Sequence, residues 1–211
     1  IENDFGFWAE TDFGAIAKFR YSYNVDTGDD TTSTRKVGYV LTDRDEGDYY
    51  TVDIKRDNAF GVPVFDMKSG TSSCPYEPGT QLRDYPEILI TPPEINNVPV
   101  GGTANFVASL TNFSRSREPR DYAVKVITNT NTDGALVKLG GSIINNSAVT
   151  YKLDFSKTTN VALTVEKGPY ATQYGPIGIV MYSPCRWESA TSDTAWISIG
   201  FQTECSTVSL S

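Results

Sequence analysis

The sequence predicts an all-β protein, and three observations lead to that prediction. Apolar and polar residues alternate along most of the chain without a sustained helical period, which is typical of strands with one buried face. Glycines and prolines, 17 and 11 in number, recur between the alternating stretches and mark turns. The 211 residues include 12 tyrosines and 10 phenylalanines, enough apolar material for a packed core. We therefore expect folded β domains.

The stretch from Gly70 to Pro86 is predicted to divide the chain. It contains three prolines, two glycines and a cysteine. Proline lacks the amide that a strand ladder needs, so we expect no regular element here. The predicted organisation is an N-terminal arm (1–12), an incomplete β-sandwich block (13–72), a hinge (73–87), a complete β-sandwich (88–205) and a short tail (206–211).

The first block supplies about four strands. Alternation runs from Phe13 to Tyr23, from Val37 to Leu41 and from Tyr50 to Ile54. The short run 62–65 contains Pro63, and proline is tolerated at sheet edges, so we expect an edge strand there. An immunoglobulin-like (Ig-like) sandwich has about seven strands. The first block is therefore predicted to be incomplete and to expose edge amides.

The second block has the strand number that the first lacks. Seven or eight short alternating segments recur at nearly regular spacing, which is typical of an Ig-like β-sandwich. They lie at 88–90, 104–110, 122–126, 136–139, 151–155, 161–165, 177–181 and 197–201.

Composition argues against several classes of function. Lysine and arginine number 18 against 26 aspartates and glutamates, and this net charge of -8 is unfavourable for binding nucleic acid or an anionic membrane surface. The chain has no histidine, which excludes Ser/His/Asp and Cys/His catalysis and histidine-containing zinc sites. No run of eighteen apolar residues is present, so no membrane insertion is expected. We expect neither an enzyme nor a cofactor.

The three cysteines, Cys74, Cys185 and Cys205, leave two bridges open. Cys185 and Cys205 end two consecutive strand-like segments and could be joined. A bridge between Cys74 and Cys185 is slightly favoured, because both lie beside a proline at loop positions. Either bridge predicts a protein outside the reducing cytosol, whereas three buried thiols remain the alternative.

Two triplets are candidates for N-glycosylation in a secretory context, with acceptors Asn112 and Asn145. The chain starts at Ile1 without a signal-peptide pattern, and we interpret it as a mature chain or a fragment.

The acidic loop Asp43, Asp45, Glu46 and Asp48 is similar to the first half of a calcium-binding loop. The full spacing fails, because a glycine precedes Asp48 and the twelfth position is Ile54. Asp43, Asp45 and Asp48 are therefore a weak calcium candidate, and a solvated acidic turn is favoured.

Six short motifs stand out along the chain: GDYYTVD (47–53), GVPVF (61–65), CPYEPGTQ (74–81), NTDGA (131–135), TVEKGP (164–169) and YSPC (182–185). Together they resemble repeats in large secreted surface proteins of bacteria and some protists. The resemblance extends over residues 36–205 and implies extracellular Ig-like modules without catalytic residues. The chain is also similar to subunits of pilus-like fibrils, in which a strand of one protomer completes the sandwich of another by donor-strand exchange.

The segment Asp4–Ala9 is the predicted donor strand. It carries Phe5, Phe7 and Trp8, and alternation places Phe5, Phe7 and Ala9 on one face. We expect this strand to enter the 13–68 block of another copy, giving a head-to-tail homopolymer. Two alternatives stay open: residues 4–9 pair within their own chain, or the first block packs on the second domain as one composite sandwich.

The leading prediction is a structural subunit of an extracellular fibril. The second is a carbohydrate-binding or adhesive module of a larger surface protein, with Trp8, Trp187 and Trp196 as aromatic candidates. Trp196 is the best of these, because it alternates with Ile197, Ile199 and Phe201 and so is predicted to face outward. A hydrolase using paired carboxylates ranks third.

Overall fold

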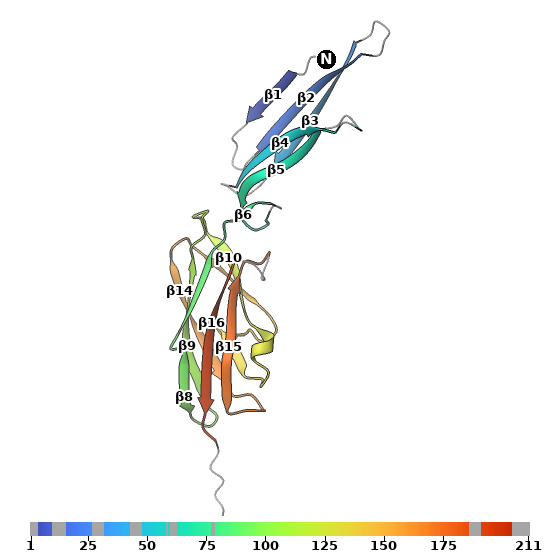
Figure 1. The fold of residues 1–211 in the computed structure, drawn as a ribbon. Helices are drawn as coiled ribbons and strands as arrows, with labels where there is room; N and C mark the ends of the chain where they lie inside the picture. The colour runs from blue at the N-terminus through green and yellow to red at the C-terminus, as the bar shows by residue number, and fades with distance from the viewer. Residues whose placement is uncertain are drawn as a thin grey trace, which may run out of the picture. The chain divides into compact units, whose positions relative to one another are not determined.

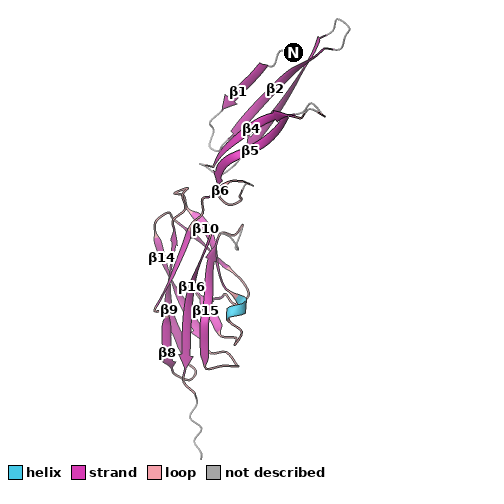
Figure 2. Cartoon of the chain, in the orientation of Figure 1, coloured by secondary structure: helices cyan, strands magenta, loops and turns pink. Residues whose placement is uncertain are grey.

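The computed structural model describes residues 4–9, 16–26, 32–42, 48–57, 59, 63–76, 79–185 and 191–203. In this part of the chain the protein is all-β, and its one helix is the single 3₁₀ turn Thr128–Thr130 (Figure 2). Two compact units are formed, Ile1–Leu82 and Arg83–Ser211, and the boundary between them falls within residues 73–87. No helix among the described residues has the length and apolarity needed to span a membrane.

The first unit contains two three-stranded sheets (Figure 1). The first sheet consists of β1 (Asp4–Ala9), β2 (Ile16–Asp26) and β3 (Thr32–Thr42), in the order β1-β2-β3, and both pairings are antiparallel. The second consists of β4 (Tyr49–Arg56), β5 (Pro63–Ser72) and β6 (Gln81–Leu82), in the order β4-β5-β6. β2 and β5 are therefore the central strands of this unit.

One expectation about the first unit was wrong. The stretch from Gly70 to Pro86 contains regular structure, since β5 continues to Ser72 and the two-residue strand β6 follows. The segment containing Pro63 does lie at an edge: among the described residues it pairs with β4 alone, because β6 lies beside only Thr71 and Ser72 of β5. Proline is also accepted there because Pro63 is the first residue of the strand.

The second unit is a sandwich of two five-stranded sheets, with the orders β13-β10-β15-β16-β8 and β12-β11-β14-β9-β7. The sequence predicts seven or eight strands for this unit, and its described residues form ten. The two strands that were not predicted are β8 and β12. The bounds of the ten strands are β7 (Pro86–Thr91), β8 (Glu94–Val98), β9 (Thr103–Asn112), β10 (Arg120–Val126), β11 (Leu136–Leu139), β12 (Ser142–Ile143), β13 (Val149–Leu153), β14 (Thr158–Glu166), β15 (Gln173–Tyr182) and β16 (Ser192–Phe201).

The strand order is that of an Ig-like sandwich. Strands β7, β9, β14 and β11 correspond to one sheet of that fold, and β10, β15 and β16 to the other. The chain changes sheets between β7 and β8, where Pro92 and Pro93 interrupt the strand. β8 then pairs with β16 in parallel, whereas every other pairing in this unit's sheets is antiparallel.

The core lies between the two sheets of this unit. Alternate residues of the strands are buried, as in β7, where burial and exposure alternate strictly. Tyr174, near the start of β15, donates its hydroxyl to the carbonyls of Ala171 (2.6 Å) and Gly168 (3.0 Å). This hydrogen bond back to the preceding loop is the tyrosine corner typical of Ig-like sandwiches. The Tyr174 ring packs edge-on against Phe201.

Candidate functional site

The predicted donor residues Phe5, Phe7, Trp8 and Ala9 all lie in β1. β1 pairs with β2 of the same chain over its whole length, from Asp4 opposite Ser22 to Ala9 opposite Ala17. This intrachain pairing was one of the alternatives left open by the sequence. β2 continues to Asp26 and pairs with β3 along its full length, so its last four residues extend past β1. β1 is therefore a short edge strand on a longer central strand.

Both outer strands of this sheet are suited to accept a further strand. Within the described residues, β1 and β3 each pair with β2 alone. Neither contains a proline, and β3 is eleven residues long. Long edge strands without prolines present rows of backbone donors and acceptors that can pair with another chain.

The edge strand β7 of the sandwich has the opposite character. The amide of Phe113 donates to the carbonyl of Tyr85, so hydrogen-bonded pairs fall at odd-numbered residues of β7 and the even-numbered amides point away from β9. The first even position, Pro86, has no amide hydrogen, and the next, Ile88, donates to the Asp193 carboxylate at 2.9 Å. β7 thus offers little to another strand, and Asp193 ties it to β16 of the other sheet.

The remaining edges of the sandwich are short or irregular. β12 has two residues and β13 has five. In β8, Asn97 has a left-handed φ of 60°, and the pairing with β16 shifts register beside it. A residue in this conformation interrupts the regular row of backbone groups. Among the described edge strands, the long regular ones therefore belong to the first unit.

Asp48 of the weak calcium candidate has a structural role. Asp48 is only 5% exposed, and its two carboxylate oxygens accept the Ser73 amide at 3.0 and 3.1 Å. The hydrogen bonds anchor the chain just after β5. Asp43 and Asp45 lie outside the described residues, and the described residues contain no group of three acidic, cysteine or histidine residues placed to hold a metal ion.

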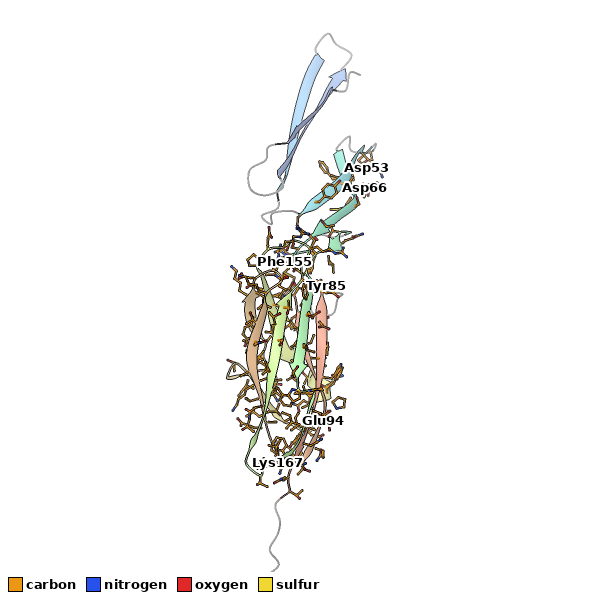
Figure 3. The ribbon with its side chains drawn as sticks, turned by 90° about the vertical axis from the view of Figure 1, so that its left-hand side faces the viewer. Asp53, Asp66, Tyr85, Glu94, Phe155 and Lys167 are labelled. Carbon is orange, nitrogen blue, oxygen red and sulfur yellow. The ribbon has the colours of Figure 1, made fainter. Side chains whose placement is uncertain are left out.

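Four charged residues form an ion cluster on the β4–β5 hairpin (Figure 3). The Lys68 ammonium lies 2.6 Å from Asp66 and 3.5 Å from Asp53, and Lys55 also contacts Asp66. The hydrogen bonds from Lys55 and then from Lys68 lower the pKa of Asp66 from 3.8 to about 2. The cluster contains two positive and two negative side chains, so it leaves no net charge to attract a charged ligand.

The first glycosylation candidate, Asn112, is buried in a polar network. Its amide nitrogen donates to the carbonyls of Glu118 (2.8 Å) and Leu153 (3.0 Å), and its carbonyl oxygen accepts the Ser114 amide at 2.9 Å. The Tyr122 hydroxyl also donates to this oxygen, at 3.2 Å. Asn112 has no exposed surface. A glycan on the amide nitrogen is therefore sterically incompatible with this fold.

The second glycosylation candidate also has both ends of its amide engaged. Asn145 donates to the Ala135 carbonyl at 2.7 Å and accepts the Val137 amide at 2.8 Å. Its side chain is half-buried and fixes the loop before β13 against β11. Glycosylation of Asn145 would disturb these hydrogen bonds.

Cys74 and Cys185 are both disulfide-bonded. This agrees with the bridge that the sequence favours slightly. Cys205 lies outside the described residues. A disulfide is compatible with secretion, because such bonds persist in oxidising compartments.

Trp196 is exposed, as its place in the alternating pattern predicts, with 49% of its surface accessible. It pairs with Gly178 on β15. A Cβ atom at Gly178 would lie 2.9 Å from Cζ3 of Trp196 and 3.0 Å from the Ile127 side chain. The indole therefore rests against the glycine, on the outer face of the sheet. The Trp8 side chain and Trp187 are outside the described part of the structure.

Sequence reasoning missed Asp193 and Tyr122. Asp193 lies in an otherwise ordinary alternating segment, and its acceptor role depends on β7, more than a hundred positions earlier. Tyr122 resembles any core tyrosine in sequence, yet its hydroxyl accepts the Tyr85 amide at 3.2 Å and bonds to Ser114. Burial raises the pKa of Tyr122 to about 12.

Comparisons with known proteins gave no match, neither to a family model nor to a curated protein.

Proposed function

We propose that this protein is a non-enzymatic structural subunit of an extracellular, pilus-like fibril. Copies join head to tail, and β1 is the strand that one copy contributes to the next. The observation that carries the proposal is the position of β1: a six-residue edge strand without proline, on a sheet of only three strands. Small sheets with open edges gain stability when a further strand is added.

The composition of β1 supports this role. Three of its six residues are aromatic. Aromatic burial contributes roughly 25 cal/mol per Å² of apolar surface, so three such side chains could supply several kcal/mol to a contact between copies. Part of that gain is offset by the entropy lost when the strand is ordered.

The contrast between the two units supports a polymer joined through the first unit. In β7 the first two outward-facing positions are unavailable, because Pro86 has no amide hydrogen and the Ile88 amide is bonded to Asp193, whereas β1 and β3 contain no proline. A contact that uses different surfaces on the two partners, and that does not close into a ring, produces a filament.

Deleting residues 1–10 tests the proposal. Assembly is expected to be lost because the contributed strand is removed, whereas the sandwich unit stays folded because its core lies in Arg83–Ser211. Negative-stain microscopy measures filaments, and near-ultraviolet circular dichroism reports on the sandwich. A matched variant lacking residues 206–211 should still assemble. Filaments that persist without residues 1–10 would contradict the proposal.

A second function, a carbohydrate-binding or adhesive module, is favoured by Trp196. An exposed indole on a sheet face can stack on the apolar face of a sugar ring. Gly178 has no side chain, which leaves room for the Trp196 indole to lie against the sheet. This function predicts a monodisperse monomer by size exclusion, with glycan binding that is weakened by Trp196→Ala. The same purified chain thus distinguishes the two functions.

A further inference from the structure

The proposed function leaves open which edge receives the contributed strand, and the following inference rests on that function. We infer that β1 of one copy adds to the outer edge of β3 in a second copy, while it stays paired with its own β2. The partner is therefore a second copy of this chain, and the interaction surface is the backbone edge of Thr32–Thr42.

The strand order provides the geometry. In the sheet β1-β2-β3 the central strand is paired on both sides, so β1 and β3 hold the two opposite edges. Each copy then has one contributing and one receiving edge, and a contact between them leaves the same two edges open at the ends of the growing assembly. A pairing of β3 with another β3 would instead stop at a dimer.

The direction and length of the strands are compatible. β1 and β3 are each antiparallel to β2, so they run in the same direction. Copies related by translation along the sheet would therefore join β3 to β1 in parallel. If Asp4 lies beside Arg35, Ala9 lies beside Val40, and all six residues of β1 fall within the eleven of β3.

The charged residues of the two strands favour β1 as the strand that adds to the edge of β3. The charged residues of β3 are Arg35 and Lys36, both basic, and the charged residue of β1 is Asp4. Pairing of two β3 strands would bring four positive charges together, whereas β1 brings a negative one. The basic pair thus opposes self-pairing of β3 and favours the acidic strand.

The other edges of the described strands fit less well. β4 has eight residues, but its Lys55 and Asp53 are engaged in ion pairs with residues of β5. β13 has five residues and β12 has two, while in β7 Pro86 has no amide hydrogen and the Ile88 amide is bonded to Asp193. β3 is the longest edge strand in the part of the chain that the structure describes.

Charge reversal is the first test. The double variant Arg35→Glu, Lys36→Glu is expected to raise the critical concentration for assembly at least tenfold, and adding Asp4→Lys should restore it. The control Lys152→Glu, Lys167→Glu makes the same change of charge at exposed positions of the sandwich unit and should have no effect. No rise in the double variant, or no rescue by Asp4→Lys, would overturn the inference.

Cysteine cross-linking tests the register without altering the charges, in a Cys205→Ser background. A mixture of Ala9→Cys with Val40→Cys or Leu41→Cys chains should give disulfide-linked dimers on oxidation. A mixture of Ala9→Cys with Ala17→Cys should not, because these residues pair within one chain. Cross-linking of the second mixture would mean that β1 is exchanged onto β2: the inference would fail while the proposed function stood. Assembly that is independent of residues 1–10 would overturn both.

Discussion

Asn112 connects three segments of the sandwich through one side chain. Its amide nitrogen is bonded to the carbonyls of Glu118 and Leu153, and its oxygen to Ser114 and Tyr122. All four hydrogen bonds are made by a residue with no exposed surface. The side chain therefore replaces water for backbone groups in the loop after β9 and at the end of β13.

Asn112→Ala is expected to destabilise the sandwich strongly. The change leaves buried backbone groups without a partner, and each such group costs about 1–3 kcal/mol, so we expect a loss of roughly 3 kcal/mol or more. Urea unfolding followed by tryptophan fluorescence measures it. Asn160→Ala is the matched control, because Asn160 is exposed and accepts one hydrogen bond from Ser109. A loss below about 1 kcal/mol at Asn112 would contradict this account.

Tyr122 is expected to make the stability of the folded protein depend on pH in the alkaline range. Its pKa is raised from 10.0 to about 12, with burial as the largest cause. Between these values the unfolded chain loses the phenolic proton and the folded chain keeps it, so stability is expected to fall as pH rises from 10 to 12. Unfolding free energies at several pH values should decline less steeply for Tyr122→Phe than for the unchanged protein. Equal slopes for the two proteins would contradict the assignment.

Sequence patterns predicted the position of a single side chain where alternation along the strand alone determines it. Trp196 faces outward because strand parity alone decides its side of the sheet. Asn112 had the form of a glycosylation acceptor, but its true role depends on partners in a loop and on β13. Local sequence does not contain that information, since a triplet reads the same on the surface and in the interior.

Strands are the elements that alternation predicted best. The segments at 104–110, 177–181 and 197–201 correspond to β9, β15 and β16, because each has one face against the core. Pro63 predicted an edge position for the start of β5, and there the strand pairs with β4 alone among the described residues, because β6 reaches only Thr71 and Ser72. The parallel pairing of β8 with β16 could not be predicted, since it joins segments about a hundred residues apart.

Asp193 is expected to protect the edge strand β7. In Asp193→Ala the Ile88 amide loses its acceptor, and the cost should be about 1–3 kcal/mol, because a hydrogen bond to a charged group is removed. Hydrogen exchange followed by NMR should show faster exchange of the Ile88 amide. The Leu163 amide should change little, because Leu163 lies on β14, which is paired on both sides with β9 and β11. Unchanged protection at Ile88 would contradict this role of the carboxylate.

At the scale of the whole molecule, the chain consists of two compact units with different sheets. Glycine and proline density predicted a division between 70 and 86, because such residues end strands, and the two compact units meet at Leu82 and Arg83. The nature of the first unit was less predictable: which strands share a sheet depends on contacts that alternation does not encode. The fibril and its extracellular location remain proposals built on β1, β3 and the disulfide-bonded cysteines.

A fragment of residues 73–211 is expected to fold alone. It contains the whole hydrophobic core of the sandwich and both disulfide-bonded cysteines. Its urea transition should be cooperative, and its near-ultraviolet circular dichroism should match the sandwich contribution in the full chain. A fragment without a cooperative transition would show that the sandwich depends on the first unit.

The parallel pairing of β8 with β16 has a mechanical consequence. The chain enters the sandwich through β7 and β8 and leaves it through β16, and β8 and β16 run in the same direction. Tension applied to the two ends therefore slides β8 and β16 along each other, so that their hydrogen bonds bear the load together and do not open one at a time. A module connected in this way resists stretching, a property that the proposed fibre would require of each subunit.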